Sequence, residues 1–209
     1  MRTHPLWNPY DPPSIAEIEA GRVSRPVPIA RVEVVAPDPA WPAWFAGVRD
    51  RIAVALGERA LAIEHVGSTA VPDLWAKPVI DIDLTVADSA DEAAWLPDLE
   101  AAGFVLTRRE PHWEEHRMLH GAEPRTNLHV WSATAREPRR HRMFRDWLRA
   151  HPEDRVRYAE VKRAVAAEGY TEEMLYNNAK AWVIYDLYEK ILAADPAHPH
   201  DPHPRPSDA

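Results

Sequence analysis

The chain has 209 residues, a net charge of −8 and no cysteine. At about 100–200 residues per domain, this length predicts one domain with at most a small appendage. The absence of cysteine excludes a disulfide scaffold, a cysteine-ligated zinc site, an iron–sulfur cluster and a thiol nucleophile. The acidic balance disfavours broad nucleic-acid binding, which needs a basic surface. No apolar run approaches the ~18 residues of a membrane span and no signal-peptide core is present, so we expect a soluble, cytoplasmic protein.

Hydrophobic periodicity predicts alternating strands and helices in the first two thirds of the chain. The helix expected at 39–56 is well marked, because apolar side chains recur at i, i+3 and i+4 and the pattern ends at a glycine. The strongest β-run is PVIDIDLTV at 78–86. In chain order, the expected elements are a capped helix at 14–20, a strand at 31–35, the helix at 39–56, a strand at 61–66, a turn at 67–69, a short helical stretch at 71–76, the strand at 78–86, a helix at 91–102, and strands at 104–108 and 126–132.

After residue 137 the apolar pattern becomes helical throughout. We expect three amphipathic helices, at 137–151, 152–169 and 171–195. The change of pattern divides the expected structure into an α/β core over 15–136 and a helical region over 137–194 that packs on this core.

The two ends of the chain, 1–14 and 195–209, are rich in proline, aspartate and histidine and have no apolar period. We expect both to be disordered, because such segments bury too little apolar surface to offset the loss of chain entropy. The tail histidines would then offer a metal no fixed geometry; they are His198, His200 and His203.

The residue pattern that carries chemistry lies between residues 63 and 86. A strand runs into the turn residues Gly67 and Ser68, and the next strand carries Asp81 and Asp83 about a dozen residues later. Because side chains alternate along a strand, the two carboxylates share one face, roughly 7 Å apart. Such oxygen ligands suit Mg²⁺ or Mn²⁺, and the glycine turn with its hydroxyl suits a triphosphate. The structural alternative is a solvent-facing sheet edge with acidic residues.

This pattern resembles the signature of the nucleotidyltransferase superfamily, in which Gly-Ser precedes Asp–hydrophobic–Asp/Glu. At family level, HVGSTAVPDLWAKPVIDIDLTV at 65–86 resembles the signature of the GrpB family, formerly UPF0157. RTNLHVWS, FRDWLRAHPEDRVRYAEVK and YNNAKAWVI are similar to later segments of that family, so the resemblance covers about residues 30–192. It implies an α/β (α+β) fold, with a nucleotidyltransferase-like mixed β-sheet, flanking helices and a helical C-terminal part. Asp73 departs from the family pattern, which usually has glycine there.

The resemblance and the residues together predict a Mg²⁺- or Mn²⁺-dependent nucleotidyltransferase. It would transfer a nucleoside monophosphate from a nucleoside triphosphate (NTP) to a small acceptor. The expected metal ligands are Asp81 and Asp83, which are also expected to be catalytic together with His129. The residues expected to bind the nucleotide and its phosphates are Gly67, Ser68, Thr69, Lys77, Arg125 and Lys180.

Two alternatives remain open at this point. The strand that would carry a third carboxylate offers Asn127 and His129 instead, so the protein could be a non-catalytic nucleotide-binding or regulatory module of the same fold. The stretch from His112 to His116 fits H-x-x-E-H, the pattern of an inverted zinc hydrolase, which requires both histidines on one face of a helix.

Overall fold

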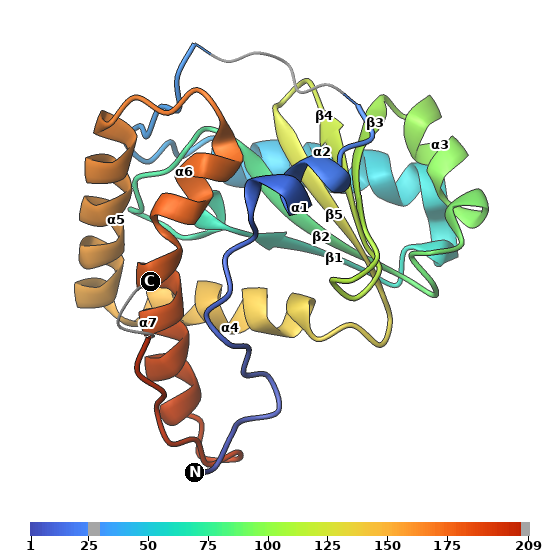
Figure 1. The fold of residues 1–209 in the computed structure, drawn as a ribbon. Helices are drawn as coiled ribbons and strands as arrows, with labels where there is room; N and C mark the ends of the chain where they lie inside the picture. Colours follow the sequence, from blue (N-terminus) through green and yellow to red (C-terminus); the bar gives the residue numbers. More distant parts are fainter. Residues whose placement is uncertain (25–29, 206–209) are drawn as a thin grey trace.

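The computed structural model describes residues 1–24 and 30–205 of the chain. Within them, five strands form one mixed sheet in the order β1-β2-β5-β4-β3 (Figure 1). The central pair β2 and β5 is parallel, and the other neighbouring strands are antiparallel. The predicted class, a mixed sheet flanked by helices, is confirmed. The strands are β1 (Ala62–Val66), β2 (Ile80–Val86), β3 (Phe104–Glu110), β4 (His116–Gly121) and β5 (Thr126–Ser132).

One face of the sheet forms the main hydrophobic core. Helix α2 (Trp41–Leu56) lies behind the strands in Figure 1, and α3 (Leu96–Ala101) follows β2 in the chain. Ile80 and Ile82 of β2 are fully buried in one cluster with Ile52 of α2. Because side chains alternate along a strand, the intervening acidic residues of β2 point to the opposite face.

The helical part of the chain covers that opposite face and has its own core. It contains α4 (Glu137–Ala150), α5 (Pro152–Ala167), α6 (Glu173–Ala179) and α7 (Ala181–Ala193). Leu148, Tyr158 and Leu187 pack there against Leu74 of the β1–β2 connection. The single helix expected at 171–195 is instead two helices that meet at Lys180, where φ is −103° and ψ is 3°. None of the described helices is long and apolar enough to cross a membrane.

Two short elements differ from expectation. The strand expected at 31–35 is absent; its backbone makes one isolated bridge, from Val35 to Ala76, and Val32 packs against the helical part. Alternating valines favour an extended chain, but among the described residues the bridge to Ala76 is the one β-pairing that this segment makes. The helical stretch expected at 71–76 is also absent, and a single 3₁₀ turn forms earlier, at Ser68–Ala70.

Strand β4 was not expected as an element, although it lies in the interior of the sheet. Its sequence HRMLHG does not alternate between apolar and polar residues as a half-buried strand does, because two consecutive polar residues, His116 and Arg117, are both buried. These polar side chains are paired: His116 with Glu110 of the neighbouring strand β3, and Arg117 with Glu92 of the connection between β2 and α3. Pairing of this kind offsets the cost of burial and makes the strand possible.

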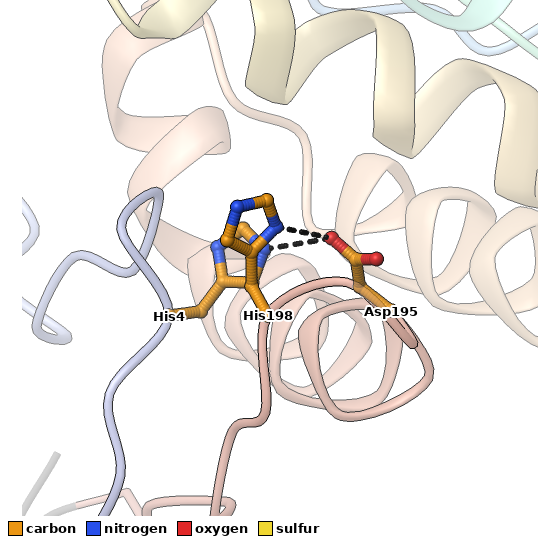
Figure 2. Close-up of side chains that lie close together, drawn as sticks. All are labelled: His4, Asp195 and His198. Atoms are coloured by element: carbon orange, nitrogen blue, oxygen red, sulfur yellow. Dashed lines mark hydrogen bonds and ion pairs between the residues drawn. The ribbon is translucent and has the colours of Figure 1, made fainter.

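The terminal segments expected to be disordered lie together against α7 in the structure. His4 is buried, and its Nε2 lies 3.0 Å from Oδ2 of Asp195; His198 Nδ1 lies 3.1 Å from the same oxygen (Figure 2). His200 makes a similar contact with Glu189, at 2.9 Å. The expectation of disorder missed the contact between the two ends because His4 and Asp195 lie 191 residues apart in the chain. Residues 206–209 of the predicted tail lie outside the described residues.

Hydrogen bonding explains the buried histidines of these contacts, His4 and His200, without a metal. Nδ1 of His4 accepts from the backbone N–H of Leu6, and Nδ1 of His200 accepts from the backbone N–H of His4. Each neutral ring therefore carries its proton on Nε2, the atom that contacts the carboxylate. A metal ligand usually donates its other ring N–H to a neighbour, which neither histidine does. These contacts thus join the chain ends by hydrogen bonds.

Replacing His4 by alanine is expected to lower the free energy of unfolding by about 2 kcal/mol, because it leaves a buried backbone N–H without its acceptor. Urea unfolding of the full chain measures this loss. His112→Ala is the matched control, since His112 is exposed. Equal stability of the two variants would show that the ends do not pack on α7 in solution.

Candidate functional site: a pocket lined by lysines and histidines

A cavity of about 380 Å³ lies between the polar face of β2 and β5 and the helices α4 to α7. It brings together six of the residues predicted from the sequence. These are Gly67, Ser68, Lys77, Asp81, His129 and Lys180. It also exposes residues that sequence reasoning missed, chiefly Lys162 and His141, together with aromatic side chains.

Three predicted residues lie outside the cavity. Thr69 is buried and donates its hydroxyl to the Val79 carbonyl, so its role is structural. Arg125 pairs with Glu173 and is half exposed. Asp83 is buried beneath the cavity wall and does not line it.

Gly67 places the backbone directly against the Asp81 carboxylate. Its φ is +66°, and a Cβ at this position would lie 2.3 Å from Asp81 Oδ2. Both the positive φ and the missing side chain therefore require glycine. Asp81 accepts a hydrogen bond from Asn127 Nδ2 at 2.8 Å. Burial raises the pKa of Asp81, although Lys77 and Asn127 favour its charged form.

Asp83 is the buried half of an ion pair. Its side chain accepts from Trp131 Nε1 at 2.9 Å, and His141 Nδ1 lies 2.9 Å from Oδ2 and 3.1 Å from Oδ1. Burial alone would lower the pKa of His141, but the Asp83 carboxylate outweighs it and raises the pKa to about 9. The pKa of Asp83 is lowered despite its burial, chiefly by the charge of His141. Both groups are therefore charged at neutral pH.

This arrangement does not fit a two-carboxylate metal site. Mg²⁺ needs carboxylate oxygens that are free to coordinate, whereas both oxygens of Asp83 are engaged by His141 and Trp131. An imidazolium next to the carboxylate also repels a cation. Asp81 alone remains, and the charges that act on it include those of Lys77 and Lys180. The positive charge of this pocket thus comes from side chains.

Two buried lysines line the cavity beside Asp81. Lys162 is 2% exposed and donates to Ser68 Oγ at 2.8 Å; Lys180 is 8% exposed, with Nζ 5.4 Å from the centre of the Tyr176 ring. Among the described residues, neither lysine has a salt-bridge partner within 4.0 Å. Burial lowers the pKa of both, that of Lys180 to about 8. The scarcity of lysine, four in the chain, was the only sequence signal that could have pointed to Lys162.

A chain of hydrogen-bonded side chains leads from the hairpin into the cavity. Glu110 Oε2 lies 2.8 Å from His116 Nδ1, and His116 Nε2 lies 3.0 Å from His129 Nδ1. The His116 ring stacks on Trp131, with centroids 4.3 Å apart. Burial lowers the pKa of His116 and lowers that of His129 well below its usual value.

The same contacts correct the zinc hypothesis. Residues 111–115 form a turn, with positive φ at Glu114 and Glu115, and His116 begins β4. His112 is exposed, whereas both nitrogens of His116 are occupied by Glu110 and His129. The two histidines therefore do not share a helical face, and the H-x-x-E-H pattern here is not a zinc site.

Known proteins with similar sequences and structures point to one family. The sequence profile of the family described as GrpB protein matches residues 31–190. A UPF0157 protein of Halalkalibacterium halodurans is 45% identical over 78% of this chain and 84% of its own length. The crystal structure of the conserved protein GrpB from Enterococcus faecalis matches with a TM-score of 0.68 and 27% identity, over 77% of this chain and 97% of that one. A dephospho-CoA kinase of Mycolicibacterium paratuberculosis is 32% identical. The match covers 78% of this chain and 46% of the kinase.

Proposed function

Given that the chain belongs to the GrpB family, we propose that its pocket binds a nucleoside triphosphate through the phosphate groups and transfers the nucleotidyl group to a small acceptor. The observation that carries this proposal is the buried pair Lys162 and Lys180, which has no carboxylate salt-bridge partner among the described residues. Burying an ammonium group is costly unless an anion accompanies it. A phosphate between the two lysines removes that cost.

The remaining walls of the pocket suit the other parts of a nucleotide. Ser68 and the backbone at Gly67 lie beside Lys162 and can donate to phosphate oxygens. Tyr158, Tyr176 and other aromatic side chains line the cavity and offer flat apolar surfaces to a base. A volume of 380 Å³ lies within the range of roughly 300–1,000 Å³ that holds small-molecule ligands.

Thermal unfolding of the full chain tests the binding step. With ATP, GTP, CTP or UTP at about 100 times Kd and EDTA present, binding adds about 2.7 kcal/mol, so we expect the melting temperature to rise by about 5–11 °C. Lys162→Met and Lys180→Met should each remove this shift. Lys190→Met is the control, because Lys190 pairs with Asp154 outside the pocket. A shift that needs Mg²⁺, or that survives both pocket substitutions, would contradict the proposed role of the lysines.

The lowered pKa of Lys180 also predicts how binding depends on pH. The free pocket loses the Lys180 proton as the pH rises through about 8, whereas a bound phosphate restores the charged form. Nucleotide binding should therefore take up a proton, and Kd should increase as pH rises from 8 to 10. Calorimetry in buffers of different ionisation enthalpy measures the proton uptake; none at pH 9 would contradict the proposal.

A second candidate function is a non-catalytic nucleotide-binding module. The engagement of Asp83 by His141 and Trp131 favours it, because that carboxylate cannot serve as a metal ligand. Release of pyrophosphate from the bound nucleotide, assayed over a panel of hydroxyl and amine acceptors, separates the two functions. Binding without release over the whole panel supports the non-catalytic function.

A further inference from the structure

We infer that His129 is the proton acceptor of this pocket, and that Glu110 and His116 are positioning residues that keep its Nε2 atom unprotonated. The inference deepens the proposed function and rests on it for the transfer step, although the state of the ring follows from contacts alone. It assigns roles to Glu110 and His116, which do not line the cavity. It also explains why a carboxylate and two histidines form a hydrogen-bonded series across β3, β4 and β5.

Glu110 determines which atom donates in each hydrogen bond of this series. A carboxylate only accepts, so the Nδ1 atom of His116, 2.8 Å away, must carry a hydrogen. Glu110 is ionised because His116 outweighs its burial and lowers the pKa of its carboxyl. The side chain of His116 is fully buried, which favours the neutral ring with a single hydrogen.

The tautomer of His116 in turn determines the tautomer of His129. A neutral His116 that is protonated on Nδ1 has a lone pair on Nε2, so this atom accepts from Nδ1 of His129 at 3.0 Å. A neutral His129 that is protonated on Nδ1 leaves Nε2 bare. Within residues 1–24 and 30–205, no hydrogen bond to this Nε2 is found, and His129 lines the cavity. A lone pair is thus held ready for a ligand hydroxyl or amine.

His141 is the cationic counterpart of His129 in the same pocket. The two ring centroids lie 5.9 Å apart, and Asp83 holds the hydrogen on His141 Nδ1. The charged and titratable groups that act on His129 come from three elements: His116 and His120 of β4, Asp83 of β2 and His141 of α4. Two neighbouring groups held in opposite protonation states are the usual sign of an acid–base pair.

In the transfer step, the acceptor hydroxyl gives its proton to Nε2 of His129 as its oxygen forms a bond to the α-phosphorus. The bond from this phosphorus to the bridging oxygen breaks, and pyrophosphate leaves with the electron pair. His129 becomes an imidazolium whose Nδ1–H still points to His116, and the negative charge of Glu110 stabilises it through that ring. Lys162, Lys180 and His141 balance the charge that develops on the phosphates.

The experiment is nitrogen NMR of the full chain with ¹⁵N-labelled histidine, which distinguishes protonated from bare ring nitrogens. At pH 7 without nucleotide, we expect His129 to be neutral, with hydrogen on Nδ1 and none on Nε2. Glu110→Ala and His116→Phe should convert this single tautomer into a mixture; the phenyl ring of the latter keeps the stacking on Trp131. Glu115→Ala, a change of a half-exposed carboxylate in the same hairpin, should leave the tautomer unchanged.

Hydrogen on Nε2 of His129 in the wild type, or an unchanged tautomer in a folded Glu110→Ala or His116→Phe protein, overturns the inference. These readouts need no substrate, so they are independent of whether nucleotide binds. If nucleotide binds and pyrophosphate is released, His129→Gln should lower kcat by about 10²–10⁴-fold and leave the nucleotide-induced shift in melting temperature intact. Unchanged kcat in this variant likewise overturns it.

Discussion

Replacing Asp83 by asparagine should lower the free energy of unfolding by about 3 kcal/mol at pH 6. The amide still accepts from Trp131, but it can no longer hold the charge on His141, which is itself mostly buried. The two carboxylate contacts of His141 are replaced by at most one neutral hydrogen bond. Urea unfolding measures the loss, with Asp91→Asn as the control because Asp91 is exposed.

The pH dependence of this loss follows from the sign of the His141 shift. The folded-state pKa is raised to about 9 from an ordinary value of 6.5. Its contribution to stability is therefore fully present below pH 6.5 and disappears as pH rises through 9. The difference between wild type and Asp83→Asn should shrink over this window. In a histidine NMR titration, the pKa of His141 should fall well below 9 in the variant, because burial still lowers it and only the weaker charge of Glu137 remains of the two carboxylates that raise it.

The same variant separates an ion pair from a metal site. If Asp83 and Asp81 were two metal ligands, removing one negative charge would relieve their repulsion and stabilise the protein in EDTA. The ion pair predicts the opposite sign under the same conditions. Higher stability of Asp83→Asn in EDTA would thus contradict our assignment and favour the metal.

Gly67→Ala should destabilise the protein by about 3 kcal/mol or more and abolish the nucleotide-induced shift in melting temperature. The added Cβ would lie 2.3 Å from Oδ2 and 2.8 Å from Cβ of Asp81, so the carboxylate must move away from Asn127. The backbone, at φ +66° and ψ −168°, is also in a region that is essentially restricted to glycine. The backbone strain and the steric clash therefore both destabilise the Gly67→Ala protein.

Gly47→Ala is the matched control for this substitution. Gly47 lies within α2, and a Cβ there would meet nothing within 4 Å. Because alanine is more favourable than glycine in a helix interior, the free energy of unfolding of this variant should rise by up to about 1 kcal/mol. A Gly67→Ala protein that unfolds within 0.5 kcal/mol of wild type, measured in the same urea series, would show that the turn relaxes and that the close approach to Asp81 is not required.

Local patterns in the sequence determined much of the scaffold and one side of the site. Period-2 alternation over 78–86 predicted β2 and placed Asp81 and Asp83 on its polar face, and the Gly67–Ser68 turn was predicted before it. The 3.6-residue period predicted α2, α4 and α5. These predictions succeed because alternation and helical periodicity depend on neighbours within a few residues of each other.

The partners of those residues were decided only by the tertiary structure. Asp83 meets His141 across 58 residues of chain, and Ser68 meets Lys162 across 94. Alternation assigns two carboxylates to one face, but it does not say which side chains of a distant helix will cover each of them. Coverage by α4 turned one carboxylate of the expected metal pair into the anion of a buried ion pair, and coverage by α5 and α6 surrounded the other with lysines. A charged group acquires its pKa and its chemistry from whichever groups replace its water, and packing between distant segments makes that choice.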